Sequence, residues 1–238
     1  MDVTTIKALT FDVFGTVVDW RGSVIRELEQ LGRDKDIKAD WPAFADTWRT
    51  EGYLEATAKV RRGELPWMNT DQLHRRMLDE LLARFGLTRL SEAEKEHLNR
   101  VWHRLASWPD AIAGLKRLRK RYVLATLSNG NMALLTNMAK NAGLPWDCIL
   151  SSELIKSYKT DPKVYQMAAD LLGLPTDQVM MVAAHKHDLK GAQAVGMKLA
   201  FVPRPKEWGR DTGEDLSNEP WLDVYVRDFT ELAKKLGT

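Results

Sequence analysis

Short apolar runs alternate with segments of helical periodicity through the second half of the chain. The runs lie at residues 122–127, 148–150, 179–182 and 198–202. Short apolar runs bounded by turn residues are typical of strands buried on both faces of a parallel sheet, and the helices between them supply the crossovers. Right-handed crossovers place those helices on both sides of the sheet. The sequence therefore predicts an α/β fold with a doubly wound, Rossmann-like parallel sheet.

The first strand of this sheet is expected near the beginning of the chain. Residues 6–11 are mostly apolar and end abruptly in the stretch Asp12-Val-Phe-Gly-Thr16. Ligands of open α/β sheets bind beyond the carboxyl ends of the strands, so a carboxylate at Asp12 can meet a substrate. Gly15 permits a tight turn, and Thr16 places a hydroxyl beside the carboxylate. On this stretch alone, a turn or capping role for Asp12 is an equal alternative.

Residues 18–105 carry apolar residues at helical spacing instead of strand-like runs. We expect the first of these helices to end at Gly32, and the capping-box pattern Ser91-Glu-Ala-Glu94 marks the beginning of a later one. Aromatic residues recur at helical spacing in this segment, which favours a hydrophobic core over a cofactor site. We therefore predict an all-helical cap domain over residues 18–105, inserted into a core domain of residues 1–17 and 106–238.

Composition limits the partners of the chain. The 238 residues are 44% hydrophobic, which is enough for one large core with an insertion. A formal net charge of +2 gives no strong field for nucleic acid or an anionic membrane. The basic run at residues 116–121 is interrupted by Leu118 at helical spacing, as on a solvated helix face. We expect a small-molecule substrate and no nucleic-acid partner.

Cysteine content and the first residues of the chain indicate the cellular compartment of the protein. Cys148 is the only cysteine, so disulfides within the chain and thiolate metal clusters are excluded. The first residues, Met-Asp-Val-Thr-Thr, lack the basic region and apolar run of a signal peptide, and no later apolar stretch has the length of a bilayer span. We therefore expect a cytoplasmic protein with no membrane partner.

Reactive side chains follow several of the expected strands at the point where each strand ends. The carboxyl ends of parallel strands meet at one edge of a sheet, so these side chains are expected to lie close together. The loop at residues 203–220 is rich in Pro, Gly and charge, and it either borders this site or is plain surface. The reactive side chains are Asp12, Thr16, Ser128, Asn129, Lys159, His185, His187 and Asp188.

These positions resemble the four motifs of the haloacid dehalogenase superfamily. The first motif corresponds to Phe11–Thr16, the second to Leu127–Gly130, the third to Lys159 and the fourth to Asp188. The resemblance covers nearly the whole chain and includes a helical cap inserted between the first and second motifs. Phosphatases and dehalogenases share this scaffold, so the resemblance to the superfamily leaves the reaction open.

Two positions favour a dehalogenase over a magnesium-dependent phosphatase. Phosphatases of the superfamily usually carry a general-acid Asp two residues after the nucleophile, where this chain has Phe14. They also usually complete a magnesium site with a Gly-Asp-x-x-x-Asp pattern, where this chain has Ala184 in place of the first acid. A halide leaving group needs no proton, so an apolar wall at Phe14 is sufficient. The resemblance therefore implies a site without metal or cofactor.

These departures resemble the (S)-2-haloacid dehalogenase branch, also called type II. The segment Tyr158–Tyr165 is similar to its third motif, and Trp48-Arg49 followed by Tyr53 is similar to the segment with its halide-contacting arginine. The implied reaction converts short 2-haloacids, such as chloroacetate, fluoroacetate or 2-chloropropionate, to 2-hydroxy acids. A magnesium-dependent phosphatase and a catalytically silent binding protein are the alternatives. A homodimer is one option for its assembly.

The resemblance also implies catalytic roles. Asp12 is the nucleophile that forms an aspartyl ester, and Lys159 keeps its carboxylate ionised. Asp188 orients or deprotonates the water that hydrolyses the ester. Thr16 and Tyr165 position these groups.

Substrate contacts follow from the same resemblance. Ser128 and backbone amides at the start of the following helix hold the substrate carboxylate, because helix N-termini favour anions. Arg49 and Asn129 solvate the departing halide in a site otherwise closed to water. Phe14 forms the apolar wall beside them.

His185 is a departure from the branch. Ala183 and His185 stand where its members commonly have Ser and Asn near the hydrolytic water. His185 can act as a donor, as a second base or as a wall that narrows the halide pocket, and a histidine packed without a chemical role is the alternative. A narrower pocket would favour small halides. The resemblance assigns no role to His187.

Overall fold

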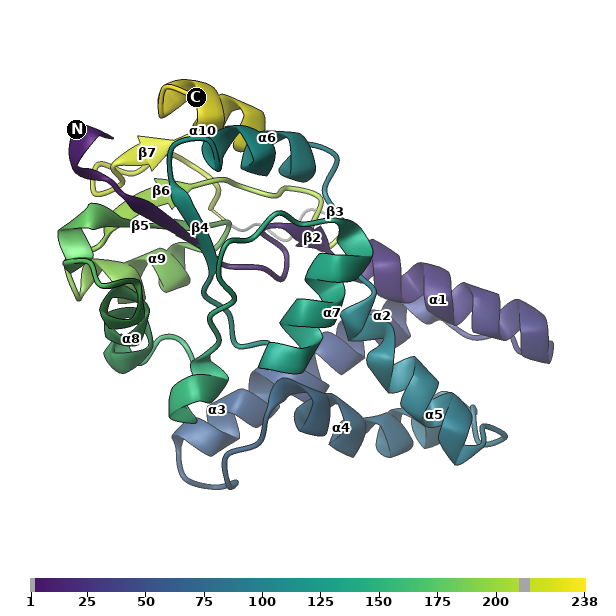
Figure 1. The fold of residues 1–238 in the computed structure, drawn as a ribbon. Helices are drawn as coiled ribbons and strands as arrows, with labels where there is room; N and C mark the ends of the chain where they lie inside the picture. Colours follow the sequence, from purple (N-terminus) through teal and green to yellow (C-terminus); the bar gives the residue numbers. More distant parts are fainter. Residues whose placement is uncertain (1–2, 210–214) are drawn as a thin grey trace.

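The computed structural model describes residues 3–209 and 215–238, and its centre is a parallel β-sheet (Figure 1). The sheet has five strands in the order β4-β1-β5-β6-β7, and each neighbouring pair is parallel. This confirms the predicted sheet and adds β7, which the sequence analysis missed. The bounds of the strands are β1 Ala8–Phe11, β4 Val123–Thr126, β5 Val179–Ala183, β6 Lys198–Phe201 and β7 Val224–Tyr225.

Helices cover both faces of the sheet, as the predicted α/β fold requires. Leu9 and Met180 belong to the same apolar core as α6 and α10, whereas Met181 and Leu199 belong to a second core with α8 and α9. In Figure 1, α6 and α10 lie above the sheet, and α8 and α9 lie below it. The helices that follow β3 are α6 Ala111–Leu118, α7 Met132–Ala142, α8 Pro162–Leu172, α9 Lys186–Gln193 and α10 Phe229–Lys235, with short 3₁₀ turns η4 Ser152–Ile155 and η5 Thr176–Gln178.

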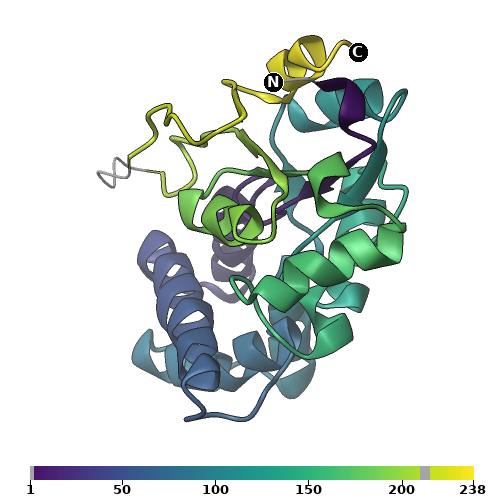
Figure 2. The same ribbon diagram turned by 90° about the vertical axis from the view of Figure 1, so that its left-hand side faces the viewer.

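The chain between β2 Val18–Asp19 and β3 Ala106–Ser107 is helical. These two short strands pair antiparallel, so both ends of the helical segment lie side by side. The two views show its helices gathered on one side of the molecule, away from α6 and α10 (Figures 1 and 2). They are α1 Trp20–Lys35, α2 Trp41–Arg49, the π-helical η2 Thr50–Glu55, α3 Ala56–Arg61, α4 Thr70–Arg84, α5 Glu92–Asn99 and the 3₁₀ turn η3 Arg100–His103; a further 3₁₀ turn, η1 Val3–Thr5, precedes β1.

Two sequence features of the helical segment are confirmed. Ser91 caps α5, and the reciprocal hydrogen bonds with Glu94 complete the predicted capping box. The tryptophans form a core rather than a cofactor site, because Trp20, Trp48 and Trp102 are fully buried. The division of the chain into a core domain and a cap domain stays a prediction.

Two predicted boundaries are wrong for identifiable physical reasons. Gly32 does not end α1, which continues to Lys35 and ends at Asp36 with left-handed backbone. Gly32 is a contact residue instead, because a Cβ atom there would lie 2.5 Å from the Trp41 ring. Residues 148–150 do not form the predicted strand, since Cys148 and Ser151 pair with the β4 region only through isolated bridges.

The loop after β6 runs beside the sheet edge where the first strand ends. Arg204 donates to the carbonyl oxygen of Thr16 (2.9 Å) and pairs with Asp110 (2.7 Å). Residues 210–214 of the predicted irregular loop lie outside the described residues. Within the described ranges, none of the helices combines the length and hydropathy needed to cross a bilayer.

Candidate active site

The turn after β1 fixes the carboxylate of Asp12 at the edge of the sheet. The Asp12 backbone N–H donates to the carbonyl oxygen of Val182 on β5 (3.0 Å), which continues the ladder past the end of β1. Gly15 has a φ of +80°, a left-handed conformation that glycine adopts without strain. The chain can therefore turn back, and Thr16 donates its hydroxyl to Asp12 Oδ2 at 2.7 Å. The same hydroxyl accepts from the N–H of Ala184 (2.9 Å), which locks its direction.

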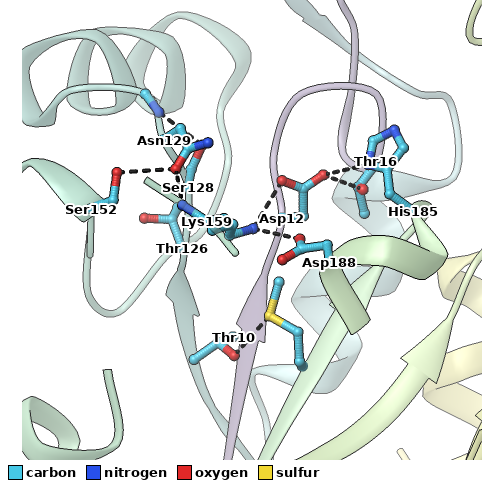
Figure 3. Close-up of polar contacts among 12 residues, drawn as sticks. Thr10, Asp12, Thr16, Thr126, Ser128, Asn129, Ser152, Lys159, His185 and Asp188 are labelled. Atoms are coloured by element: carbon cyan, nitrogen blue, oxygen red, sulfur yellow. Dashed lines mark hydrogen bonds and ion pairs between the residues drawn. The ribbon is translucent and has the colours of Figure 1, made fainter. Parts of the chain in front are cut away.

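Lys159 joins the carboxylates of Asp12 and Asp188 (Figure 3). Its Nζ lies 3.1 Å from Asp12 Oδ1 and 2.6 Å from Asp188 Oδ2. Burial opposes ionisation of Asp12, but the charge of Lys159 and hydrogen bonds from His185 and Thr16 outweigh it and hold its pKa well below the ordinary range. Burial likewise opposes the ammonium, but the two carboxylates raise the pKa of Lys159. Both groups are therefore charged at neutral pH.

Tyr165 supports Asp188 from behind. Its hydroxyl donates to Asp188 Oδ1 at 2.6 Å, and the tyrosine is fully buried in α8. Gly191 on α9 makes room for it, because a Cβ atom there would lie 2.5 Å from the hydroxyl oxygen. Burial, and then the negative charge of Asp188, raise the pKa of Tyr165, so it stays a donor. Tyr165 therefore lies behind the site and orients Asp188.

The loop after β4 supplies Ser128 and Asn129. The Ser128 hydroxyl accepts from the N–H of Gly130 (3.1 Å). Asn129 Oδ1 accepts from the Ser152 hydroxyl (3.1 Å) and from the Lys159 backbone N–H (2.8 Å), as Figure 3 shows. Because the amide oxygen is engaged, the NH₂ group is the part of Asn129 that can donate to a ligand.

These groups line one cavity of about 520 Å³. Predicted residues on its wall are Asp12, Phe14, Arg49, Ser128, Asn129, Lys159, His185 and Asp188. The structure therefore brings together eight of the ten predicted site residues at the cavity, with Thr16 and Tyr165 behind Asp12 and Asp188. The cavity also includes His187, to which we assigned no role.

Arg49 brings an unpaired positive charge to this cavity. It is only 8% exposed, and its guanidinium lies over the rings of Phe14 (5.4 Å), Trp20 (5.5 Å) and Tyr53 (4.6 Å). Its Nε has no hydrogen-bond partner, and no carboxylate of the described residues forms an ion pair with it. Burying a cation without a direct ion pair is costly, so such a group points to an anionic ligand.

Sequence reasoning assigned no site role to several residues of the helical wall. Tyr53, Thr57 and Arg61 line the cavity with Arg49, each four residues after the last. Side chains at i and i+4 share a helix face, so this spacing is a signal that could have found them.

Sequence reasoning also missed Glu207, which contacts a predicted site residue, His185. Glu207 lies in the loop after β6, is 4% exposed, and its Oε2 lies 2.9 Å from His185 Nε2. The other ring nitrogen of His185 lies 3.2 Å from Asp12 Oδ2. Of the two alternatives left open for this loop, bordering the site is therefore confirmed. No regular pattern marked Glu207, since an irregular loop has no periodicity to read.

The motifs and their geometry agree with comparisons to known proteins. Residues 6–196 match the family of haloacid dehalogenase-like hydrolases. The chain belongs to this family. The (S)-2-haloacid dehalogenase 4A of Burkholderia cepacia is 30% identical over 214 residues, which are 85% of each chain.

Solved structures of the family are similar over almost the full length. An L-2-haloacid dehalogenase is 44% identical with a TM-score of 0.91, covering 98% of this chain and 100% of the other. A defluorinating L-2-haloacid dehalogenase is 39% identical with a TM-score of 0.93, covering 98% of this chain and 96% of the other. The predicted superfamily and its dehalogenase branch are confirmed by these relatives.

Proposed function

We propose that this family member hydrolyses the carbon–halogen bond of short (S)-2-haloacids and releases 2-hydroxy acids. The observation that carries the proposal is that one cavity is lined by both the ionised Asp12 carboxylate and the buried Arg49 guanidinium, which has no ion-pair partner among the described residues. A carboxylate is the nucleophile for displacement at carbon, and a buried cation receives the departing anion. The names of the relatives, (S)-2-haloacid and L-2-haloacid dehalogenases, support this reaction.

The first step is displacement. Asp12 forms a bond to the carbon that carries the halogen, the carbon–halogen bond breaks, and the halide leaves with its electron pair. Arg49 and the NH₂ group of Asn129 stabilise the halide as its charge develops. Ser128 and neighbouring backbone amides hold the substrate carboxylate, and Phe14 supplies an apolar wall.

The second step is hydrolysis of the aspartyl ester. Water adds to the carboxyl carbon of Asp12, and Asp188 takes up a proton from it. Asp188 is suited to this role because Lys159 and Tyr165 hold its two oxygens in fixed directions. Thr16 keeps the Asp12 carboxyl group in place through both steps. The helical segment of residues 18–105 acts as a cap that carries Arg49 over the core.

Two residues argue against a phosphatase that uses magnesium. The Phe14 ring packs against Arg49 and lies 6.3 Å from the Trp102 ring, so a hydrocarbon wall stands where a general acid would protonate a leaving oxygen. Ala184 offers a methyl group where a hard cation would need an oxygen ligand. A silent binding protein would have no chemical need for the linked set of Asp12, Lys159 and Asp188.

Halide release tests the reaction directly. The protein is incubated with fluoroacetate, chloroacetate and (S)-2-chloropropionate in EDTA, and a phosphate ester with magnesium is run in parallel. We expect halide release in EDTA; phosphate release without halide release would contradict the proposal. A single turnover in heavy-oxygen water should leave the label on Asp12. Label found only in the first product molecule would exclude the ester route.

Assembly and location complete the proposal. A single, half-buried cysteine, Cys148, suits a reducing cytoplasm. The enzyme acts there on a small haloacid, as a monomer or a homodimer, and sedimentation equilibrium distinguishes these two assemblies.

A further inference from the structure

His185 and Glu207 form a buried ion pair against the nucleophile. His185 Nδ1 lies 3.2 Å from Asp12 Oδ2, and His185 Nε2 lies 2.9 Å from Glu207 Oε2. The side chains of His185 and Glu207 are 16% and 5% exposed. The imidazole is thus held between two carboxylates, in an arrangement that the proposed function above does not use.

The two oxygens of Asp12 have different environments. Oδ2 accepts hydrogen bonds from Thr16 and His185, whereas Oδ1 contacts Lys159 (Figure 3). An oxygen that already accepts two hydrogen bonds is the weaker nucleophile. Oδ1 is therefore the oxygen that forms the ester bond, and Oδ2 becomes the carbonyl oxygen of the ester.

Both ring nitrogens of His185 carry a proton in the resting site. Ionised carboxylates only accept hydrogen bonds, so a ring nitrogen that contacts one must be the donor. Asp12 and Glu207 both keep a lowered pKa despite burial, which leaves each as an acceptor. The ring is therefore an imidazolium whose Nδ1–H points at Asp12 Oδ2.

We propose that this imidazolium is the oxyanion donor for hydrolysis of the aspartyl ester, and that Glu207 is the positioning residue that keeps it protonated. The inference rests on the proposed function. As water adds to the Asp12 carboxyl carbon, the carbonyl electron pair moves to Oδ2, where His185 Nδ1–H and the Thr16 hydroxyl stabilise the charge. When the carbonyl re-forms, the bond from that carbon to Oδ1 breaks, and Oδ1 leaves as the oxygen of the product.

The protons of this step balance without a change at His185. Asp188 accepts one proton from the attacking water and passes it to Oδ1, which leaves as the hydroxyl of the 2-hydroxy acid. The other water proton leaves the regenerated Asp12 carboxylic acid for solvent. His185 therefore acts as a donor of a hydrogen bond, not as a general base.

Glu207 matters most after the first step. Before alkylation, two carboxylates face the ring; once Asp12 is an ester, Glu207 is the one that remains charged. The other titratable group against the ring is His187, whose ring centroid lies 5.5 Å away, and burial lowers its pKa, so it adds no negative charge. Lys159 contacts the far oxygen of Asp12, and Arg49 acts on Glu207 through its charge. Without Glu207, the imidazolium of the ester intermediate would lose its proton within the working pH range.

The turn after β1 is shaped around Glu207. A Cβ atom at Gly15 would overlap Glu207 Oε1, so the glycine is needed for this close approach as well as for its φ of +80°. Trp20 Nε1 donates to the same oxygen at 3.0 Å. Arg204 ties this loop to Thr16 and Asp110. The carboxylate is therefore held by Trp20 and His185, and Arg204 anchors the loop that carries it.

Glu207→Gln in the full chain tests the inference with chloroacetate under rapid quench. We expect the first halide release to stay within about threefold of wild type, while ester hydrolysis slows by about 10- to 100-fold. Intact-protein mass spectrometry should then detect alkylated Asp12. Hydrolysis by the variant should fall from pH 6 to pH 9, whereas wild type stays level over pH 6 to 8. Glu207→Asp should recover part of the rate.

Glu219→Gln is the matched control, because it removes the same charge from the same region, where Glu219 pairs with Lys186. It should leave both steps unchanged. Equal slowing of both steps in Glu207→Gln, or hydrolysis that rises with pH as for a general base, would overturn the inference. If wild type releases no halide at all, the proposed function fails and the inference with it.

A measurement on the wild-type protein does not depend on the folding of a variant. In ¹⁵N-histidine-labelled protein, both ring nitrogens of His185 should carry protons at pH 7.5. A neutral ring at that pH would overturn the assignment.

Discussion

The ammonium group of Lys159 lies 3.1 Å from Oδ1 of Asp12, and its side chain is 6% exposed. The same ammonium lies 2.6 Å from Asp188, whose side chain is 4% exposed. A single buried cation therefore neutralises part of the charge of two carboxylates that have little access to water. This arrangement links the stability of the site to its chemistry.

The Lys159→Met variant should lose both stability and catalytic activity. Removing the cation leaves two buried carboxylates unpaired, so we expect the free energy of unfolding to fall by roughly 3–5 kcal/mol. Halide release should fall by at least ~10³-fold, because the pKa of Asp12 rises and less of it is ionised. Urea unfolding and halide assays measure the two effects. Lys186→Met removes a cation at the beginning of α9, the helix that carries Asp188, and should change both stability and halide release only slightly. Wild-type stability in Lys159→Met would contradict the argument.

Asp12→Asn should be inactive and folded. The amide keeps the size of the side chain, and Lys159 keeps its ion pair with Asp188, so the site retains its shape. An amide does not displace halide, and the rate should fall to less than ~10⁻³ of wild type. Circular dichroism and halide release are measured on the same sample. Normal halide release would exclude Asp12 as the nucleophile.

The sequence was informative wherever a repeating pattern fixed geometry. Parallel strands end at one edge of the sheet, so Asp12, Ser128 and Asp188 could be placed together before the structure was known. Arg49 could be placed only through the resemblance, because a lone arginine in a helix is ordinarily a surface residue. The structure gives the physical reason for its burial, which is three aromatic rings around the guanidinium.

Long-range contacts explain what the sequence could not predict. Glu207 reaches His185 from an irregular loop, and no local rule says where such a loop lies. Residues 148–150 have the composition of a strand, but an apolar run forms a strand only where it keeps a regular hydrogen-bonding register with its neighbour. Beside β4, this segment makes only isolated bridges. Gly32 carried a helix-stop signal, and its contact with Trp41, from the next helix, is a tertiary effect.

Gly32→Ala tests that tertiary effect. In an exposed helix interior this change stabilises a protein by up to ~1 kcal/mol. Here the new Cβ would lie 2.5 Å from the Trp41 ring and 2.9 Å from the Ile37 carbonyl oxygen. We therefore expect a loss of about 1–3 kcal/mol in the free energy of unfolding. Adding Trp41→Leu should recover part of this loss; fully additive effects of the two changes would contradict the contact.

The stability that His185 contributes should depend on pH. Burial disfavours the imidazolium, but Glu207 and Asp12 outweigh it and hold the pKa of His185 well above its ordinary value. A raised pKa in the folded state gives stability that is complete below the unfolded value of about 6.5 and is lost as pH rises toward the folded value. The difference in unfolding free energy between wild type and His185→Gln should therefore shrink from pH 6 to pH 8, by up to ~1.4 kcal/mol per pH unit. Urea titrations at each pH measure it, and a constant difference would argue against an imidazolium.

Arg49→Met should separate function from stability. The guanidinium is buried over aromatic rings without a carboxylate partner among the described residues, so methionine, which is apolar and of similar length, should raise the free energy of unfolding by about 1–2 kcal/mol. The halide would lose its main stabilising charge, and kcat/KM should fall by about 10²–10³-fold. Bromide should raise the melting temperature of wild type but not of this variant, because a ligand stabilises only the protein that binds it. Arg62→Met, at an exposed arginine of the same helical segment that does not line the cavity, should keep the wild-type response to bromide. A bromide response that survives in Arg49→Met would move the halide site elsewhere in the cavity.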